Sequence, residues 1–388
     1  MDFTFTEEQL ALQDTLTRFV EKDYAFEQRR KNLAARHHFN EATWQAFAEL
    51  GILALPFAEE DGGLNGTPLD TYLVMRSLAR GLVLEPYIST VVLSGTFLQQ
   101  HATTEQRSVL IPAIADGSAR FAFAHYDVES RYEESRIQTR AVNHEGKWTL
   151  NGHKAMVIDA PVCNHWLITA RTSGEQQDQN GLSVFLVKAD HPGITVKSYQ
   201  LHDGHLAADL ILDNVELQPE ALIGAADTAY PAIMQALAAT HAALAAEADG
   251  LMAALNVATL EYLKTRKQFG VAIGTFQAVQ HRMADMAIAA EQATSMALLA
   301  AISQSAEDPQ ERILKASGAR ALLARLARQV GEEAVQLHGG MGVTDELVVA
   351  HYFKRVTVLN TQYGDADFHL KRYSDSLLTF NQGEQAHA

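Results

Sequence analysis

Apolar residues recur with a helical period at both ends of the chain, whereas the middle part carries short runs typical of strands. Near the N-terminus, Thr6 and Gln9 form a capping-box pattern directly before an amphipathic run. Asn40 is placed to cap a second helix, which should end at Gly51. We therefore expect residues 1–118 to form an N-terminal α-helical domain. Its predicted helices cover residues 10–26, 42–50, 69–83 and 105–117.

From Arg120 onward the chain consists of short segments rich in β-branched and aromatic residues, separated by Gly, Asn, Asp and Pro. Such segments are typical of strands, and the pair Asn151 and Gly152 predicts a tight turn. Because these strands are joined by turns and not by helices, residues 119–228 should form a middle antiparallel β-sandwich or barrel. Residues 229–388 return to Ala and Leu at helical spacing and should form a C-terminal α-helical bundle. The predicted fold class is α+β with several domains.

The last long helix has signals at both ends. Asp308 is placed as its N-cap, Pro309 as its first residue and Glu311 as a capping-box partner. The helix should end at Gly339 and Gly340, where the backbone can turn with positive φ. A ligand that carries phosphate could approach bare backbone there. More often, such a pair of glycines only terminates a helix and binds no ligand.

Composition narrows the class of function. The chain of 388 residues is long enough for two or three domains, and 47% hydrophobic with 20% charged residues fits a globular protein. With 31 Lys and Arg against 47 Asp and Glu, the net charge of −16 argues against nucleic acid or an anionic membrane as a partner. An anionic ligand would need a local basic pocket. The sixteen histidines show no metal-ligand spacing.

Three features favour a reducing, cytoplasmic location. The lone cysteine, Cys163, cannot form an internal disulfide. The acidic start MDFTFTEEQL does not resemble a signal peptide. Alanine-rich stretches are interrupted by polar residues, so no apolar span is expected to be long enough to cross a bilayer.

Several separate motifs along essentially the whole chain resemble acyl-CoA dehydrogenases, and their common order makes the resemblance far more specific than any one motif. Within that family the chain is most similar to the subfamily that includes small subunits of pimeloyl-CoA dehydrogenase. The resemblance implies an N-terminal helical domain, a middle β-domain and a C-terminal four-helix bundle that enclose FAD and an acyl chain. The motifs are PFAEEDGG, LVLEPY, AHYD, ESRY, AEADG, EYLKTRKQFGVAIGTFQAVQHR, HGGMGVTDE, HYFKR and YGDAD.

Two of these motifs are expected to hold FAD. Arg266 supplies a delocalised cation with paired donors suited to pyrophosphate, and Phe269 can pack on a planar ring. Read without the resemblance, Arg266 is a solvated cation and Phe269 a core residue. The resemblance implies that the first motif contacts FAD and that the glycine motif binds the FAD of a neighbouring subunit. The implied cofactor residues are Arg266, Gln268, Phe269, Gln277, Gln336, Gly339, Gly340 and Gly342.

The resemblance is looser in the β-domain. The flavin-facing strand of the family reads approximately Y-x-x-T-E-P-x-x-G-S, and here the threonine falls near Tyr126 and the Gly-Ser is replaced. The second flavin strand, usually W-I-T, reads Met156, Val157 and Ile158. His125, Tyr126 and Val157 are therefore candidate cofactor contacts, and backbone groups can bond isoalloxazine without the usual side chains. A structural role is the commoner one for His125 and Tyr126.

The catalytic base is the open question. Many members of the family carry a glutamate after the tyrosine of the late turn, where this chain has Gly364, and others carry it on the first bundle helix near Thr240 and His241. Asp365, one residue from the first position, is the leading substitute, with a turn cap as its alternative role. Glu247, two helical turns beyond Thr240 in an apolar run, is the second, with an ion pair to an arginine as its alternative role. A third carboxylate of the turn, Asp367, points inward less obviously.

The sequence as a whole indicates an FAD-dependent acyl-CoA dehydrogenase that forms a trans-2-enoyl-CoA. By resemblance, an electron-transfer flavoprotein accepts the electrons, and the assembly is a homodimer, a homotetramer or a heterotetramer with a second acyl-CoA dehydrogenase subunit. Asp365 and Glu247 are the candidate catalytic residues. The alternative is an FAD-binding or scaffold subunit of a heteromeric enzyme that lacks the base.

Overall fold

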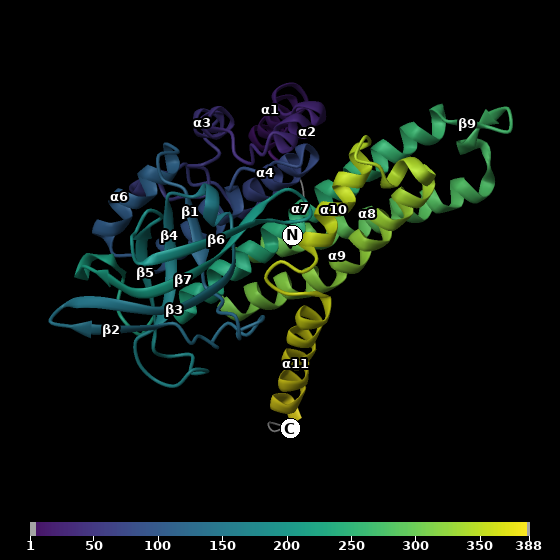
Figure 1. The fold of residues 1–388 in the computed structure, drawn as a ribbon. Helices are drawn as coiled ribbons and strands as arrows, with labels where there is room; N and C mark the ends of the chain where they lie inside the picture. Colours follow the sequence, from purple (N-terminus) through teal and green to yellow (C-terminus); the bar gives the residue numbers. More distant parts are fainter. Residues whose placement is uncertain (1–4, 386–388) are drawn as a thin grey trace. The chain divides into compact units, whose positions relative to one another are not determined.

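The computed structural model describes residues 5–385, and its chain divides into two compact units. The sheet unit comprises residues 33–67 and 84–240, and the bundle unit comprises residues 1–32, 68–83 and 241–388. Figure 1 shows helices, then strands, then long helices along the chain, as the sequence predicts. The division into three domains at residues 118 and 228 stays a prediction.

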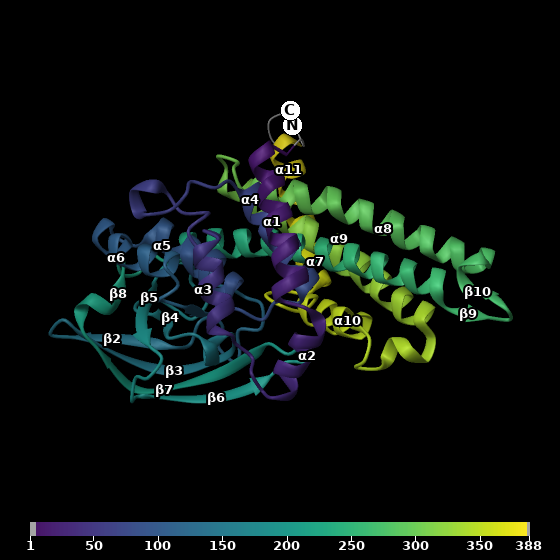
Figure 2. The ribbon, with the colours of Figure 1, turned by 90° about the horizontal axis from the view of Figure 1, so that it is seen from above.

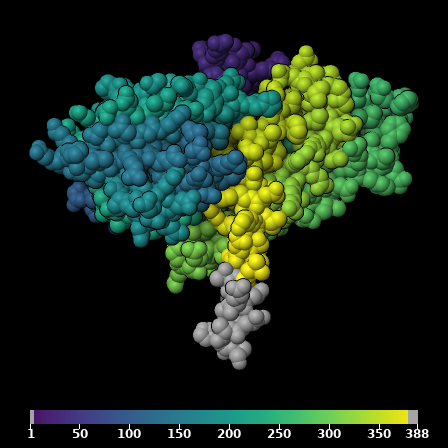
Figure 3. Space-filling view, turned by 60° about the horizontal axis from the view of Figure 1, so that its bottom comes forward, coloured from purple at the N-terminus to yellow at the C-terminus, as the bar shows by residue number. Residues whose placement is uncertain are grey.

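The strands of the sheet unit form one sheet in the order β6, β7, β3, β2, β4, β5, β8, with β1 paired to β4. Most neighbours are antiparallel, but β1 with β4 and β2 with β4 run parallel, so the sheet is mixed. On the face drawn in Figure 3, its residues form a continuous blue and teal surface. The strands are β1 (Phe121–Ala124), β2 (Arg140–His144), β3 (Lys147–Ile158), β4 (His165–Arg171), β5 (Leu182–Lys188), β6 (Ile194–Gln200), β7 (Leu206–Leu217) and β8 (Leu222–Ile223).

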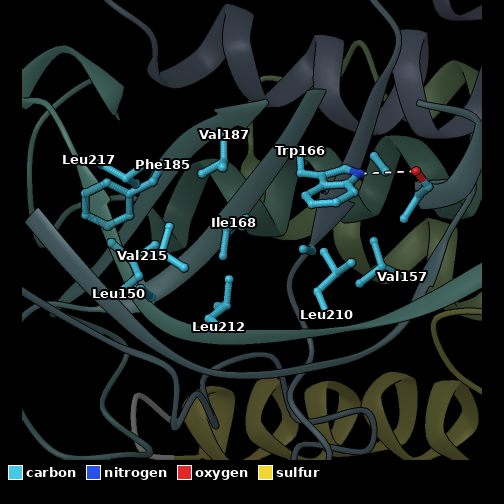
Figure 4. Close-up of a cluster of buried hydrophobic side chains, with 14 of the residues drawn as sticks. Leu150, Val157, Trp166, Ile168, Phe185, Val187, Leu210, Leu212, Val215 and Leu217 are labelled. Atoms are coloured by element: carbon cyan, nitrogen blue, oxygen red, sulfur yellow. Dashed lines mark hydrogen bonds between the residues drawn. The ribbon is translucent and has the colours of Figure 1, made fainter. Parts of the chain in front are cut away.

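One hydrophobic cluster of the sheet unit lies on one face of these strands, and the opposite face of β1, β4 and β5 is buried as well. Trp166, Ile168 and Leu210 are buried in this cluster, and in Figure 4 they point toward a common centre. The indole Nε1 of Trp166 donates to the carbonyl oxygen of Ala160 at 3.2 Å, which satisfies the polar atom of the largest core side chain. The α-helices that lie wholly in this unit are α3 (Glu41–Glu49), α5 (Gly95–His101) and α6 (Thr104–Ala115), and a π-helical stretch, Ile88–Ser94, leads directly into α5.

The predicted turn at Asn151 and Gly152 is wrong. The hairpin between β2 and β3 turns instead at Glu145 and Gly146, which have φ of 52° and 89°. Gly152 lies inside β3, next to a register shift in its pairing with β7. A Cβ at Gly152 would lie 2.3 Å from Oγ1 of Thr139, so glycine is required there by a close approach and not by a turn.

In its described residues the bundle unit consists of helices and one short two-stranded hairpin, and its longest helices are α7, α8 and α9. Figure 2 shows α8 and α9 running alongside each other, and these two helices have an extensive interface. Capping follows the sequence, since Thr6 and Gln9 form a capping box on α1 and the side chain of Asp308 caps α9. Its helices are α1 (Glu7–Asp23), α2 (Phe26–Ala34, up to residue 32), α4 (Pro68–Gly81), α7 (Tyr230–Thr265, from residue 241), α8 (Gln277–Ser303), α9 (Pro309–His338), α10 (Val348–Leu359) and α11 (Ala366–Gln385).

Two of these helices correct an expectation. By length and composition α7 and α8 are apolar enough to span a membrane, whereas the sequence pattern predicted no such segment. In the most apolar window of α7, 72% of the residues are buried inside the protein, and 39% are buried in that of α8. The burial of α7 is what a core helix of an alanine-rich bundle shows, whereas less than half of the α8 window is buried.

Candidate active site

A two-stranded hairpin connects α7 to α8 in the bundle unit. It consists of β9 (Lys267–Gln268) and β10 (Val271–Ala272), and its turn has positive φ at Phe269 and Gly270. Phe269 is 92% exposed, so it is not the core residue that a purely structural reading expects. Arg266, Gln268 and Gln277 are exposed as well. The hairpin lies at the far end of α7 and α8 in Figures 1 and 2.

The glycine motif follows the end of α9. Gly339 has φ of 59°, but Gly340 has no positive φ, so only the first of the two glycines turns with the predicted positive φ. A Cβ added at Gly339 or Gly340 would meet no atom within 4 Å, and Gln336 is exposed. The backbone at these two glycines is therefore open, as a phosphate cradle requires. Gly342 differs, because a Cβ there would lie 2.5 Å from the carbonyl oxygen of Val335.

The hairpin and the glycine motif are joined at their bases. The ring of Tyr262, near the end of α7, stacks on the ring of His338, the last residue of α9, with centroids 4.3 Å apart. The hydroxyl of Tyr262 donates to the carbonyl oxygen of His338 at 3.4 Å. The two segments that the sequence assigns to FAD thus leave neighbouring helix ends of one unit.

In the sheet unit, the segment after β1 is fixed by a buried ion pair. Nζ of Lys154 lies 2.9 Å from Oδ1 of Asp127 and donates to the carbonyl oxygen of His125 at 2.8 Å. Oδ2 of Asp127 also accepts the backbone N–H of Thr139 at 2.8 Å. Burial opposes the charge on Asp127, but Lys154 and the hydrogen bonds from Thr139 outweigh it and hold the pKa of this carboxyl below its usual value. Sequence reasoning did not single out Lys154.

Three candidate residues lie on this segment and on β3. Nδ1 of His125 hydrogen-bonds Oγ1 of Thr169 at 3.1 Å, and burial, with Lys154 nearby, lowers the pKa of His125 to about 3. The carbonyl oxygen of Tyr126 accepts the N–H of Ala155 at 2.9 Å. Val157 is 3% exposed and belongs to the hydrophobic core, as Figure 4 shows. Its side chain therefore packs inside the sheet unit.

Glu247 makes the ion pair that was the alternative to catalysis. It is 6% exposed on α7, and its two carboxylate oxygens accept from Nε and Nη2 of Arg355 at 2.5 and 2.7 Å. Both oxygens are thereby engaged by one planar guanidinium. Arg355 belongs to the HYFKR motif on α10. In the same motif Lys354 pairs with Asp345.

Asp365 lies in the turn before α11 and is half-buried. Its Oδ1 accepts the backbone N–H of Phe368 at 2.9 Å, and its carbonyl oxygen accepts the N–H of His369. The side chain therefore caps α11 with one oxygen. Asp367, two residues later, is exposed.

The two positions that the resemblance suggests for a base, near His241 and at Gly364, both lie against His369 in the bundle unit. The rings of His241 on α7 and His369 on α11 lie edge to face with centroids 4.5 Å apart. A Cβ added at Gly364 would lie 2.6 Å from Nε2 of His369. His369 was missed in the sequence, since nothing in the FHLKR segment marks it as close to His241.

Comparison with known proteins decides the family. Sequence models of the acyl-CoA dehydrogenase N-terminal, middle and C-terminal domains match residues 6–118, 123–215 and 230–378. The chain belongs to the acyl-CoA dehydrogenase family. It is thus an FAD-dependent oxidoreductase that acts on acyl-CoA, and the predicted class of fold, function and cofactor is confirmed.

Individual relatives agree along nearly the full length of this acyl-CoA dehydrogenase. A probable acyl-CoA dehydrogenase of Bacillus subtilis (strain 168), YngJ, is 27% identical over 372 residues, which is 95% of this chain and 97% of the relative. A structure reported for the electron transferring flavoprotein of Acidaminococcus fermentans matches with 27% identity and a TM-score of 0.90, covering 97% of this chain and 100% of that one. A variant of the steroid acyl-CoA dehydrogenase Tcur3481-Tcur3483 matches with 27% identity and a TM-score of 0.85 over 98% and 99% of the two chains.

Proposed function

We propose that this acyl-CoA dehydrogenase holds FAD with the hairpin and the glycine motif described above. Arg266 would pair with the pyrophosphate, Phe269 would pack on a ring of the cofactor, and Gln268 and Gln277 would donate hydrogen bonds. Gln336 and the open backbone at Gly339 and Gly340 would contact the FAD of a neighbouring subunit, while Gly342 would hold the motif in shape. The observation that carries this assignment is that these cofactor residues other than Gly342 are exposed and that the glycine backbone is open.

The sheet unit would meet the flavin through backbone groups. Lys154 and Asp127 fix the main chain at His125. Because the carbonyl oxygens of His125 and Tyr126 already accept hydrogen bonds, backbone N–H groups of this segment and of Val157 would be the donors to the polar edge of isoalloxazine. FAD held there would supply the hydride acceptor for oxidation of the acyl group. The task of the protein is to hold the thioester, exclude water and take the proton from Cα.

We propose that Asp365 removes the proton from Cα, and Glu247 is the second candidate for this role. A carboxylate must reach the proton at Cα, and Asp365 commits only one oxygen to the cap of α11 in the bonds described above. Glu247 has both oxygens in its ion pair with Arg355. Releasing Glu247 would leave a buried guanidinium without its carboxylate, which makes it the weaker candidate.

The structural partners of Asp365 and Glu247 favour a second possible function. Both have structural partners, and Gly364 cannot be replaced by glutamate without displacing His369. The chain would then be the subunit of a heteromeric enzyme that completes a cofactor site and leaves proton removal to its partner. The similar steroid enzyme, whose name pairs Tcur3481 with Tcur3483, supports this arrangement, as does the resemblance to small subunits of pimeloyl-CoA dehydrogenase.

Spectroscopy of the purified chain separates the two functions. A yellow protein that bleaches when an acyl-CoA is added anaerobically is an enzyme on its own, whereas a protein that stays unreactive until a second subunit is added is the incomplete subunit. Asp365→Asn keeps an oxygen for the cap but removes the base, so the bleaching rate should fall by at least about a thousandfold at unchanged flavin content. Asp375→Asn removes an exposed carboxylate farther along α11; it is the control and should bleach normally. A normal rate in Asp365→Asn excludes this residue as the base.

Partners and location follow from the same proposal. An electron-transfer flavoprotein would accept the electrons, in line with the similarity noted above. A cofactor site shared between subunits requires a homodimer, a homotetramer or a heterotetramer. The cytoplasm is the proposed location, and mixing the reduced protein with an electron-transfer flavoprotein tests the electron acceptor directly.

A further inference from the structure

The bundle unit contains two buried imidazoles that the reaction has not used. His241 and His369 are each 1% exposed and come from α7 and α11. None of their four ring nitrogens has a hydrogen-bond partner within the part of the chain that the structure describes. A buried polar atom without a partner is costly, so a site with four of them needs a further group to satisfy it.

The surroundings keep both rings neutral. Burial is the main cause that lowers the pKa of each ring, to about 2 for His369 and well below the ordinary value for His241. The positive charges of Arg320 and Arg372 lower both pKa values further. Each neutral ring offers one N–H donor and one acceptor nitrogen. The pair is a poor proton acceptor, because an imidazolium would form beside two guanidinium groups.

The same surroundings suit an oxygen atom. An oxygen that accepts from the imidazole N–H groups would give these donors the acceptor that they lack among the described residues. The positive charges of the two arginines would favour any negative charge on that oxygen. Arg320 is itself fixed, since its Nη2 donates to the carbonyl oxygens of Leu359 and Gln362 at 2.7 and 3.1 Å. These bonds hold the chain just before Gly364, so the cationic group and the pair keep their relative positions.

We propose that His241 and His369 form a binding site for a hydrogen-bond-accepting oxygen carried on the acyl group of the substrate. The proposal rests on the proposed function, because the acyl group is expected at the two positions, near His241 and at Gly364, that the resemblance suggests for a base. His369 contacts the ring of His241 and fills the space beside Gly364. The substrate class is therefore an acyl-CoA with a carboxylate or keto oxygen on its acyl chain, and not a plain aliphatic ester.

Binding of matched CoA esters to the flavin-loaded protein tests this site. Three esters of one chain length are compared by calorimetry, ending in a methyl group, a keto group and a carboxylate. We expect at least one oxygen-bearing ester to bind about tenfold or more tightly than the methyl ester. If the carboxylate ester binds more tightly than the ketone, the site favours an anion next to the two arginines. If the ketone binds more tightly, the site favours a neutral oxygen. Equal affinity for all three overturns the proposal and leaves a trapped water as the partner of the imidazoles.

Variants localise the preference. His241→Phe and His369→Phe keep a ring of similar shape without nitrogen and should abolish the preference, while affinity for the methyl ester is retained. His241→Gln and His369→Gln retain a donor and an acceptor and should preserve part of it, which keeps the test usable if a phenylalanine variant does not fold. His165→Phe on β4, where the ring stacks on Phe121, is the control. A preference that survives in the double phenylalanine variant contradicts the site.

The same experiment separates the two proposals. Bleaching of the flavin by any of the esters reports on the dehydrogenase function, whereas the ratio of binding constants needs no turnover. Protein that never bleaches but still prefers an oxygen-bearing ester retains the binding site and loses the function assigned to this chain alone. Protein that bleaches with all three esters and binds them equally retains the function and loses the site.

Discussion

The ring of His369 occupies the space that a side chain at Gly364 would need. A Cβ on Gly364 would lie 2.6 Å from Nε2 of His369, and Gly364 has φ of 134°, which side chains rarely adopt. Gly364→Glu should therefore destabilise the protein by about 1–3 kcal/mol and should not create a fast enzyme. Thermal unfolding and anaerobic bleaching check both statements. Gly364→Glu combined with His369→Gly removes the ring contact and should recover part of the lost stability, and no recovery would place the cost in the backbone alone.

The ion pair between Glu247 and Arg355 should contribute to stability whether or not Glu247 takes part in catalysis. Glu247→Gln leaves Arg355 buried without its carboxylate, so we expect a loss of about 3–5 kcal/mol in the free energy of unfolding. Urea denaturation measures this loss. Replacing both partners by apolar residues, as in Glu247→Leu with Arg355→Met, should cost much less. A double variant as unstable as Glu247→Gln would show that the cavity and not the lone charge sets the cost.

How much of this structure the sequence predicts depends on how far apart in the chain the interacting residues lie. Caps such as those of Thr6, Asn40 and Asp308 are local, and the structure has each of them. Asn151 and Gly152 carry an equally strong local signal for a turn, but the packing of Gly152 against Thr139 places the pair inside a strand. The pairing of His241 with His369 joins two helices far apart in the chain. No local pattern could indicate that pairing.

The buried histidines should make the protein less stable in mild acid. His125 and His369 have pKa values of about 3 and about 2 in the folded chain, because burial disfavours the cation, against an ordinary value of 6.5. Between those values the unfolded chain binds protons that the folded chain does not, so stability falls as the pH drops below about 6.5. Each ring should contribute a slope of up to about 1.4 kcal/mol per pH unit. Urea unfolding from pH 8 to pH 5 should show a shallower decline in His369→Phe, and an unchanged slope would show that this ring is accessible to protons in the folded protein.

The exposed hairpin should matter for the cofactor and not for folding. Arg266→Ala and Phe269→Ala remove side chains that lie on the surface, so the free energy of unfolding should change by no more than about 0.5 kcal/mol. Retention of FAD through gel filtration should fall about tenfold or more. Lys264→Ala, which removes an exposed cation paired with Glu261, is the control and should retain FAD normally. Normal retention in both hairpin variants would move the cofactor away from this segment.

The glycine motif offers a matched pair of substitutions that separates cofactor binding from packing. Gly340→Ala adds a methyl group where nothing lies within 4 Å, so the protein should fold normally and bind FAD more weakly. Gly342→Ala adds the same methyl group 2.5 Å from the carbonyl oxygen of Val335, and α9 or the motif must shift to admit it. We expect Gly342→Ala to lower stability by about 1–3 kcal/mol and Gly340→Ala to leave it unchanged. Thermal unfolding of the flavin-free proteins, followed by titration with FAD, measures the two effects independently. If Gly340→Ala binds FAD as tightly as the parent protein, the bare backbone is not the surface that meets the cofactor.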